Sequence, residues 1–296
     1  MPQKKVRIVR SVVSFMPPGY GRAMADPQGR GGFDAPLVAV VAPSCPIERS
    51  VKDQVEAIVN GRLRLRWAEQ CFALGGHYAG ADAEREDALV DAWNDPEVSA
   101  IWFARGGAGA ARIASAGVAR TVDAPTKIVL GFSDAGFVHA AMLRAGRAGA
   151  LWGPMIADVA RVGGERAIER AVRLLTGSDG PEDHASTGAV AFNLSVLCAT
   201  LGTPLEPPLG GRTVMLEDVG EPLYRLDRLF GQLTSQPWFP SVAGVRLGRF
   251  SDTGNDRPFG RSVEEIAGEW LARAEVALLE PVDIGHDAGN KLVRLS

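Results

Sequence analysis

The chain has 296 residues, of which 46% are hydrophobic, and its formal net charge at pH 7 is −3. This composition is typical of a folded globular protein with one large or two smaller domains. The small net charge gives no reason to expect nucleic acid or an anionic membrane surface as a partner. No apolar run approaches the roughly 18 residues that cross a bilayer. Neither a phosphate-binding loop of the G-x-x-x-x-G-K-[ST] type nor a G-x-G-x-x-G motif occurs, so we expect no cofactor.

The cysteines and histidines indicate the compartment and exclude common metal sites. Cys45, Cys71 and Cys198 cannot all pair, and none belongs to a C-x-x-C motif. A reducing compartment is the simplest interpretation, and we expect a cytoplasmic protein. None of the 4 histidines stands in H-x-x-x-H spacing, so we expect no metal ion.

The first half of the chain alternates apolar runs with helical patterns. Residues 1–35 read as an irregular tail, because prolines and glycines interrupt them and no period is sustained. From there to residue 160, continuous apolar runs predict strands that are buried on both faces of a parallel sheet. The predicted strands are 35–43, 98–104 and 127–132, and the predicted helices are 50–74, 83–94 and 110–119. This order predicts an α/β fold with a Rossmann-like, flavodoxin-like parallel sheet.

The second half of the chain reads as a smaller domain. Residues 161–186 are predicted as a linker, with a charged helix at about 165–176 followed by a polar stretch. Residues 187–296 then predict a mixed, β-rich domain. Its helices are expected near 193–201, 222–235 and 262–274, and its shorter apolar runs are 213–217, 243–250 and 276–282.

Three turns follow predicted strands of the first domain, and parallel sheets form their sites beyond these strand ends. They are A-P-S ending at Ser44, R-G-G-A-G at 105–109, and G-F-S-D at 131–134. A glycine-rich turn before a helix is either a tight turn, an anion cradle or an oxyanion hole made of backbone N–H groups. The sequence leaves these three alternatives open.

Ser133 in G-F-S-D-A also has two interpretations. It resembles the G-x-S-x-G elbow on which α/β-hydrolases carry a nucleophile, but local sequence alone favours an ordinary helix cap. A nucleophilic serine needs a histidine base and a carboxylate that orients this base. His77 in a loop and His184 in the linker are expected to be solvated, and His139 stands on the helix after Ser133. His286, in the loop V-D-I-G-H-D-A-G-N, is therefore the preferred base.

Three acidic residues are candidates for the carboxylate that would orient His286. Glu217 ends the apolar run T-V-M-L-E of the second domain. An acidic residue at the end of a buried strand is less often a solubilising surface charge than an acidic residue on an exposed helix face. Asp218 and Glu221 are alternatives on local sequence alone.

Several long motifs run through this chain. They begin with A-P-S near residue 43 and continue with the segment 77–113, which contains R-G-G-A-G. They are followed by G-F-S-D-A-G-F-V-H, W-G-P-M, F-N-L-S-V-L-C-A-T-L-G-T-P, M-L-E-D-V-G-E-P-L-Y-R-L-D-R and a final G-H. In content and order these motifs resemble the LD-carboxypeptidases, the serine peptidase family S66, and the resemblance covers the chain from about residue 37 onward.

The resemblance implies a catalytic triad of Ser133, Glu217 and His286, with Glu217 preferred over its neighbours. It implies an oxyanion hole made by the backbone N–H groups of Asp134 and of Gly106 and Gly107. It also implies a Rossmann-like domain followed by a smaller β-rich domain, and a homodimer.

The substrate follows less directly from the resemblance. Arg105, Ala108 and Ser44 are expected to contact it, although Ala108 stands where the family usually has tyrosine, and Phe192 replaces a glycine. The expected activity is the release of a terminal D-amino acid from an L,D-linked murein peptide. One alternative is cleavage of an amide to a nucleotide-like group, as in microcin C immunity, and another is a non-catalytic binding module on the same fold.

Overall fold

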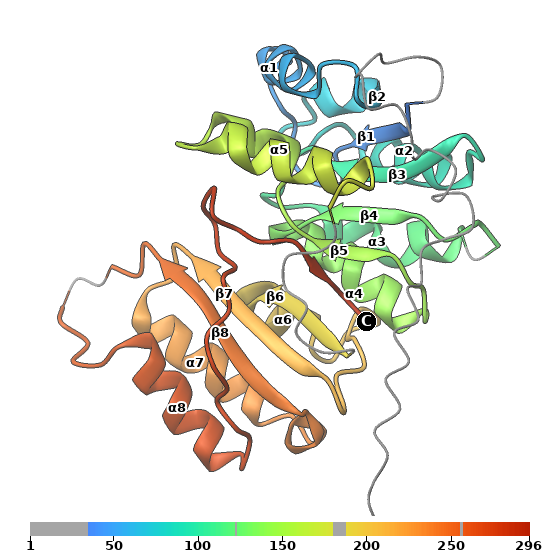
Figure 1. Ribbon diagram of the computed structural model, residues 1–296. Helices are drawn as coiled ribbons and strands as arrows, with labels where there is room; N and C mark the ends of the chain where they lie inside the picture. The colour runs from blue at the N-terminus through green and yellow to red at the C-terminus, as the bar shows by residue number, and fades with distance from the viewer. Residues whose placement is uncertain (1–34, 122, 180–187, 255–256) are drawn as a thin grey trace, which may run out of the picture.

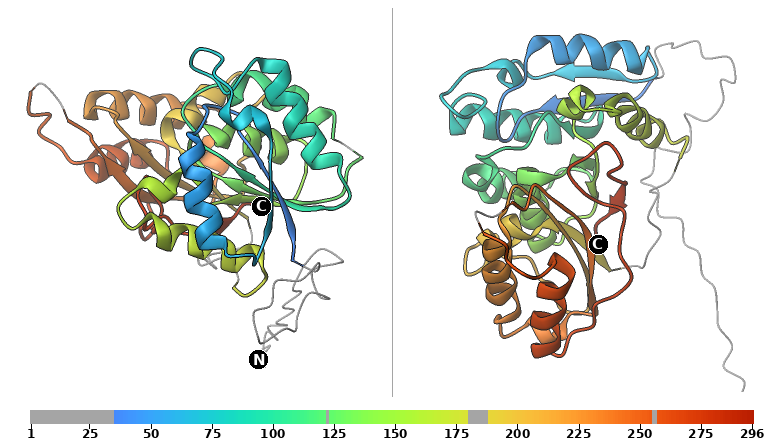
Figure 2. Two further views of the ribbon diagram at one scale, coloured as in Figure 1. Left: turned by 90° about the horizontal axis from the view of Figure 1, so that it is seen from above. Right: turned by 90° about the vertical axis from the view of Figure 1, so that its left-hand side faces the viewer.

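The computed structural model describes residues 35–121, 123–179, 188–254 and 257–296. The predicted tail at 1–34 and the polar part of the predicted linker at 180–187 lie outside the described residues. Two parallel sheets flanked by helices make up the described part of the chain (Figures 1 and 2).

The larger sheet has six strands in the order β2-β1-β3-β4-β5-β9. All neighbours are parallel except β9, which is antiparallel to β5. Its elements are β1 (Leu37–Val41), α1 (Arg49–Val59), β2 (Arg64–Trp67), a 3₁₀ turn η2 (Glu69–Phe72), α2 (Asp82–Asn94), β3 (Val98–Phe103), α3 (Ala110–Ala119), β4 (Ile128–Gly131), η3 (Ser133–Ala135), α4 (Gly136–Arg144), β5 (Ala150–Trp152), η4 (Ile156–Ala160), α5 (Gly164–Leu175) and β9 (Val293–Arg294).

Helices cover both faces of this sheet. Val38 and Val40 of β1 belong to the apolar cluster formed with α1 and α5. Ala39 and Val41 belong to the cluster formed with α2, α3 and α4. Because successive strand residues point to opposite faces, all but one residue of each of the central strands β1, β3 and β4 are buried. This confirms the prediction of a doubly wound parallel sheet.

The predicted helix over 50–74 is wrong beyond Val59. Asn60 (φ 46°) and Gly61 (φ 73°) are both left-handed and end α1. The next residues, R-L-R-W, form β2, whose exposure alternates along the strand. This strand lies at the edge of the sheet, so it has the alternating pattern of a strand that is only partly buried, and not the continuous apolar run of β1.

The smaller sheet has three parallel strands in the order β6-β7-β8. Its elements are β6 (Ala189–Asn193), α6 (Leu194–Thr200), β7 (Thr213–Val219), α7 (Leu223–Thr234), η5 (Phe239–Ser241), β8 (Gly244–Ser251) and α8 (Val263–Arg273). Helices α6, α7 and α8 pack on one face. On the other face, Ala191 and Met215 share a cluster with Phe132 and Trp152 of the larger sheet, so the two sheets have a common core.

Two segments cross the boundary that the sequence predicts between the domains. Helix α5, within the predicted linker, packs on the larger sheet. After β8 the predicted apolar run at 276–282 forms one isolated bridge, Val245 to Leu278, and no named strand. The chain then returns to the larger sheet, where Leu295 N–H donates to Ala150 O (3.0 Å) and Ser296 N–H donates to Ala189 O (3.0 Å). The loop before β9 therefore passes over the junction of the two sheets.

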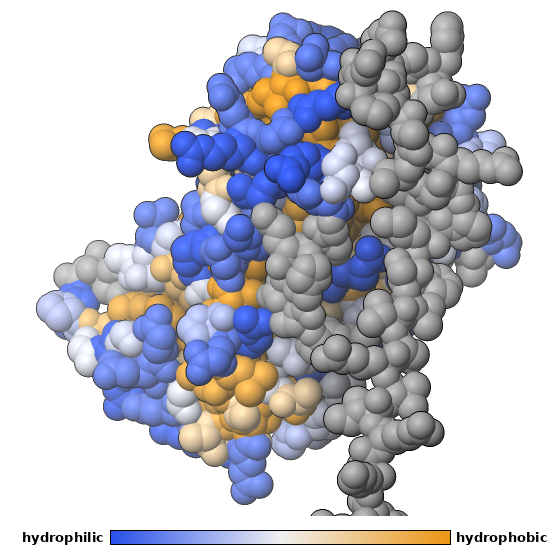
Figure 3. Space-filling view, in the orientation of Figure 1, coloured by the Kyte–Doolittle hydropathy of each residue, from blue (hydrophilic) through white to orange (hydrophobic). Residues whose placement is uncertain are grey.

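No helix among the described residues is long and apolar enough to cross a bilayer. On the face seen in Figure 3, hydrophilic side chains separate the apolar patches.

Candidate active site

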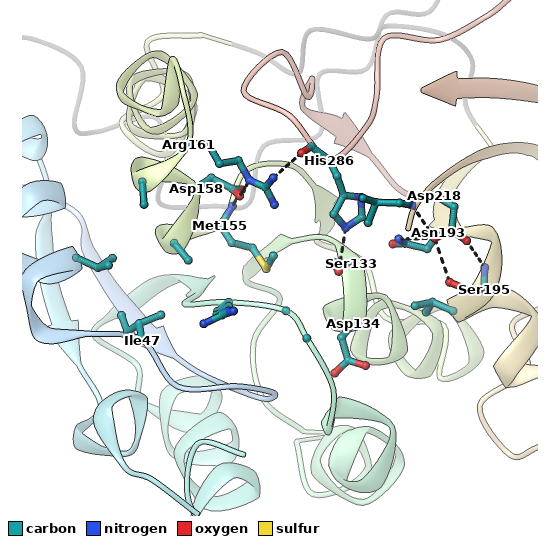
Figure 4. A pocket seen from close by; sticks show the side chains of 18 of the residues that line it. Ile47, Ser133, Asp134, Met155, Asp158, Arg161, Asn193, Ser195, Asp218 and His286 are labelled. Atoms are coloured by element: carbon teal, nitrogen blue, oxygen red, sulfur yellow. Dashed lines mark hydrogen bonds and ion pairs between the residues drawn. The ribbon is translucent and has the colours of Figure 1, made fainter. Parts of the chain in front are cut away.

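A cavity of about 630 Å³ opens at the junction of the two sheets. Residues of α1, the R-G-G turn and η4 line it from the larger sheet, and the ends of β6 and β7 line it from the smaller one. Ser133 and His286 both face this cavity (Figure 4). The cavity wall therefore contains two of the three residues of the predicted triad.

Ser133 lies at a sharp turn between β4 and η3. Its φ is 59°, in the left-handed region that non-glycine residues seldom occupy and that is often found at functional sites. It is the N-cap residue of neither η3 nor α4, which begin after Phe132 and Ala135, and its hydroxyl contacts His286 instead. A Cβ on Gly131 would lie 2.7 Å from Phe103, and a Cβ on Gly106 would lie 2.9 Å from Ser133 Oγ. The geometry of an elbow, and not that of a helix cap, accounts for these features.

His286 connects Ser133 to Glu217. His286 Nε2 lies 3.1 Å from Ser133 Oγ, and its Nδ1 lies 2.7 Å from Glu217 Oε2. Both distances are within hydrogen-bond range. The carboxylate at Nδ1 favours the tautomer whose Nδ1–H donates to Glu217 and whose Nε2 accepts the Ser133 hydroxyl proton.

Glu217 is the acid that contacts His286, and it is fully buried. Burial raises the pKa of Glu217 to about 6, and the hydrogen bond to His286 opposes this rise. Of the two alternatives, Asp218 bonds to Ser195 and its neighbours, and Glu221 forms an ion pair with Arg225. Both alternatives thus have other partners.

The loop that carries His286 is attached to the larger sheet. Arg161 Nη1 donates to His286 O (2.6 Å), and Arg161 Nε donates to Asp158 Oδ1 (2.6 Å). Asp158 in turn accepts Met155 N–H (2.8 Å). Burial raises the pKa of Asp158, while Arg161 and, more weakly, His286 lower it. The Phe132 ring lies 4.8 Å from the imidazole, centre to centre.

A second set of contacts joins the same loop to Trp152 of β5 and to Arg249 of β8. Asn290 Oδ1 accepts Trp152 Nε1–H (2.9 Å) and Gly285 N–H (3.2 Å). Arg249 of β8 pairs with Asp287 through two hydrogen bonds, of 2.5 and 2.9 Å. The imidazole therefore projects from a loop that is tied to both sheets.

The R-G-G-A-G turn packs directly against the elbow. A Cβ on Gly106 would lie 3.4 Å from Asp134 N, so the backbone of the turn and the first N–H after Ser133 lie next to the serine hydroxyl. The Asp134 carboxylate accepts Ser44 Oγ–H (2.6 Å) and Ala110 N–H (2.8 Å). This position suits backbone donors that would stabilise an oxyanion on a substrate carbonyl.

The predicted substrate contacts separate into two groups. Arg105 is exposed and lines the cavity, as does Gly107 of the predicted oxyanion turn. Ser44 and Ala108 are absent from its wall. Ser44 is fully buried and its hydroxyl donates to Asp134, so its side chain lies away from the cavity. The carbonyl of Ala108, within the R-G-G-A-G turn, accepts a hydrogen bond from the Cys45 thiol (3.8 Å).

The two other described histidines, His77 and His139, do not line the cavity. His139 is completely buried, its Nε2 lies 3.0 Å from Val129 O, and burial lowers its pKa to about 4. His77 is exposed, 3.5 Å from the Cys45 thiol, and His184 lies outside the described residues. Among the described residues, no group of three or more His, Cys, Asp or Glu side chains could hold a metal ion.

Two clusters in the cavity wall were not predicted as part of the site, although Asp218 was considered as an alternative acid. One is the Asp158–Arg161 pair, and the other comprises Asn193, Ser195 and Asp218. The second had a detectable signal, because Asn193 ends the apolar run A-V-A-F-N as Glu217 ends its own. The first had none, because η4 is a single irregular turn.

Comparisons with known proteins bear on both halves of the chain. A family model described as the LD-carboxypeptidase N-terminal domain matches residues 38–151, and one described as the LD-carboxypeptidase C-terminal domain matches residues 189–295. A protein of Streptomyces coelicolor named as a carboxypeptidase is 32% identical over 85% of this chain and 86% of its own. The murein tetrapeptide carboxypeptidase of Pseudomonas aeruginosa is 29% identical over 86% of this chain and 89% of its own.

Solved structures agree in fold. The microcin C7 self-immunity protein MccF has a TM-score of 0.73 at 16% identity, covering 88% of this chain and 91% of its own. The muramoyltetrapeptide carboxypeptidase of Oxalobacter formigenes has a TM-score of 0.72 at 19% identity, covering 88% of this chain and 92% of its own.

Proposed function

The chain belongs to the LD-carboxypeptidase family, and we propose that it is a serine-type carboxypeptidase that releases a terminal D-amino acid from an L,D-linked murein peptide. The observation that carries this proposal is the continuous hydrogen-bond chain from Ser133 through His286 to Glu217. The relative from Pseudomonas aeruginosa, which is named as a murein tetrapeptide carboxypeptidase, supports this substrate class.

The first half of the proposed reaction forms an acyl-enzyme. Ser133 Oγ attacks the carbonyl carbon of the bond before the terminal residue, and its proton passes to His286 Nε2. Glu217 stabilises the imidazolium that forms. The backbone N–H groups of Asp134 and of the Gly106–Gly107 turn would stabilise the oxyanion. The carbon–nitrogen bond then breaks, and His286 protonates the departing amine.

The second half releases the shortened peptide. A water molecule gives its proton to His286 Nε2 and attacks the acyl carbon, and the ester bond to Ser133 breaks as the proton returns to Oγ. Each step uses the same base, so the reaction needs no cofactor.

Arg105 fits the terminal carboxylate that a carboxypeptidase must recognise. It is exposed, lines the cavity and directly precedes Gly106. Among the described residues it forms no ion pair. A guanidinium at this position would bind a carboxylate on the leaving-group side of the scissile bond.

We also propose that the protein works as a homodimer in the cytoplasm, in the recycling of cell-wall peptides. The family resemblance suggests the dimer, and Cys45, Cys71 and Cys198 are all unpaired, as in proteins of a reducing compartment. Sedimentation of the purified protein and localisation of a tagged copy test these two points.

A substrate panel tests the proposed activity. The purified protein is incubated with an L,D-linked murein tetrapeptide and with an aminoacyl nucleotide conjugate, and free D-amino acid and free nucleotide are measured. We expect D-amino acid release by the wild type and none by Ser133→Ala. Release of nucleotide alone would favour the microcin-type alternative. The likeness of this fold to that of MccF is compatible with this alternative. No cleavage of either, with no labelling of Ser133 by a serine-reactive fluorophosphonate, would favour a binding module.

A further inference from the structure

Arg85 on α2 is a fully buried cation next to the turns that surround Ser133. Its Nη2 donates to Asp82, whose side chain is 41% exposed, and its Nε is buried without a hydrogen-bond partner among the described residues. A buried guanidinium costs free energy unless all its donors are satisfied, and well-packed apolar side chains are often at least as stabilising. Stability alone therefore does not account for an arginine at this position.

The other terminal nitrogen of Arg85 joins two of the three turns that follow strands of the larger sheet. Its Nη1 donates to Pro43 O (2.5 Å), in the A-P-S turn after β1, and to Gly109 O (2.9 Å), at the end of the R-G-G-A-G turn after β3. A Cβ on Gly109 would lie 2.7 Å from Nη1, so this turn packs directly on the guanidinium. Because charge-assisted hydrogen bonds are stronger than neutral ones, the guanidinium fixes the two turns relative to each other.

The peptide group between Gly109 and Ala110 is held by opposite charges at its two ends. Its carbonyl accepts a hydrogen bond from Arg85, and its N–H donates to Asp134 Oδ2 (2.8 Å). Asp134 is 7% exposed and directly follows Ser133 at the elbow. Hydrogen bonds in a buried chain polarise and strengthen one another. Arg85 is therefore coupled to the elbow through one peptide group and one carboxylate.

Ser44 closes these contacts into a network. Its hydroxyl donates to the same Asp134 oxygen (2.6 Å), and Ser44 directly follows Pro43, whose carbonyl accepts from Arg85. In Figure 4 the Asp134 carboxylate points away from Ser133, so these contacts lie behind the elbow and outside the reacting atoms. The Arg85 network comprises Arg85, Pro43, Ser44, Asp134 and the Gly109–Ala110 peptide group, and it joins all three turns.

We propose that Arg85 is a positioning residue for the oxyanion donors, the backbone N–H groups of Asp134 and of the Gly106–Gly107 turn. This rests on the proposed function. Asp134 contributes its carboxylate to the network and its N–H to the donors, and the turn with Gly106 and Gly107 ends at Gly109, which Arg85 holds. The donors bind negative charge that develops only during the reaction. Their alignment therefore affects kcat and leaves substrate binding largely unchanged.

Two substitutions of Arg85 test this role. Arg85→Met keeps the length of the side chain and removes every donor, and we expect kcat to fall by about 100-fold, as for a misplaced catalytic group. KM should change by less than about threefold, because the lost alignment acts in the transition state. Arg85→Lys keeps the charge and a donor for the two carbonyls, so it should lose only about three- to tenfold in kcat. Wild-type kcat in Arg85→Met, or a change confined to KM, would overturn the proposal.

Arg112→Met is the matched control. Arg112 pairs with Asp82 as Arg85 does, and its guanidinium also lies over the Tyr78 ring, at 5.9 Å against 4.9 Å for Arg85. It is exposed, and its guanidinium is not part of the Arg85 network. Arg112→Met should keep kcat within about twofold of wild type. A loss equal to that of Arg85→Met would mean that the contacts with Asp82 and Tyr78 carry the effect, which would contradict the proposal.

Ser44→Ala tests the network if Arg85→Met does not fold. It removes one hydrogen bond to the Asp134 carboxylate and leaves the arginine in place. We expect kcat to fall by about tenfold at unchanged KM, as for a hydrogen bond to a charged group. Circular dichroism and the melting temperature identify the folded variants. Wild-type kcat in folded Ser44→Ala and folded Arg85→Lys would overturn the positioning role.

Labelling of Ser133 separates this role from the proposed function. A fluorophosphonate reacts with the serine hydroxyl and places a phosphonyl oxygen where the oxyanion would form, so its rate depends on the donors and on no murein peptide. We expect Arg85→Met to be labelled at least about tenfold more slowly than wild type, and Arg112→Met as fast as wild type.

The labelling rates stay decisive if the substrate is wrong. If the wild type is labelled but cleaves no murein peptide, the proposed function is wrong and the rates alone test the positioning role. Slower labelling of Arg85→Met then supports this role, and equal rates for Arg85→Met and wild type overturn it. If the wild type is neither labelled nor active, the proposed function and the positioning role are both wrong.

Discussion

Arg161 donates a hydrogen bond from its guanidinium to the main-chain carbonyl of His286 at 2.6 Å. The same guanidinium is held by Asp158 in the short turn after β5. His286 comes from the loop before β9, so this contact joins the larger sheet to the loop that carries the imidazole. Arg161 is therefore a positioning residue whose loss should misalign His286.

We expect Arg161→Ala to lower kcat by about 10- to 100-fold, because a displacement of about 1 Å in a reacting group has an effect of this size. KM should change less, and Arg161→Lys should restore part of kcat. Arg173→Ala, which removes a surface ion pair with Asp179, serves as control. Steady-state kinetics decide, and a rise in KM at unchanged kcat would mean that Arg161 binds substrate instead.

Ser133→Ala tests the nucleophile. We expect kcat to fall by on the order of 10⁴-fold or more, with an unchanged circular dichroism spectrum. Ser133→Gly should be as inactive and should unfold at a higher temperature than Ser133→Ala, because glycine adopts the left-handed φ of this position without strain. Activity of Ser133→Ala within tenfold of wild type would exclude Ser133 as the nucleophile.

Glu217→Gln tests the orienting carboxylate. The substitution keeps the shape of the side chain and removes the charge that stabilises the imidazolium. We expect kcat to fall by roughly 10²- to 10⁴-fold, up to the loss reported for the analogous change in a Ser-His-Asp triad. Glu221→Gln, with its separate ion pair, should lose far less. The assignment is wrong if Glu221→Gln is the inactive variant and Glu217→Gln stays active.

Burial of Glu217 also predicts a pH dependence of activity. Its pKa is raised to about 6, and a proton taken up by the Glu217–His286 pair removes the base that Ser133 needs. We expect kcat/KM to decline as the pH falls below about 6. A profile that stays flat down to pH 4.5 would show that the carboxylate does not titrate in this range.

His139 predicts a pH dependence of stability. Its pKa is lowered from 6.5 to about 4 in the folded chain, so the unfolded chain binds the proton more readily. The contribution of neutral His139 to stability is present above pH 6.5 and is lost as the pH falls toward 4. Denaturant unfolding should show a loss of about 3 kcal/mol across this range for wild type relative to His139→Gln. Parallel curves for the two proteins would contradict this.

Local sequence patterns were sufficient for most of the larger sheet. The continuous apolar runs at Leu37–Val41 and Val98–Phe103 predict strands buried on both faces, and helices cover both faces of the sheet. The edge strand β2 was missed because an exposed edge removes the continuous apolar signal. Ser133, Glu217 and His286 were likewise identified by motif, while their roles in catalysis stay predictions.

Distance along the chain limits what such patterns can decide. His286 and Ser133 are 153 residues apart in sequence, and only the return of the chain to the larger sheet as β9 brings the loop of His286 over the elbow. The contacts of Arg161 with His286 and of Asp218 with Ser195 also join separate elements.

The sequence by itself determined where the main buried strands end and which polar residues stand at these ends, because burial and turn chemistry act within a few neighbouring residues. The tertiary structure alone decided which of these residues share the cavity. Ser44 and Asp218 illustrate the difference. Ser44 follows β1 and Asp218 is the last residue but one of β7, yet Ser44 is buried against Asp134 while Asp218 lines the cavity. The physical reason is that a side chain's access to a crevice depends on how two sheets pack together, and no local period encodes that packing.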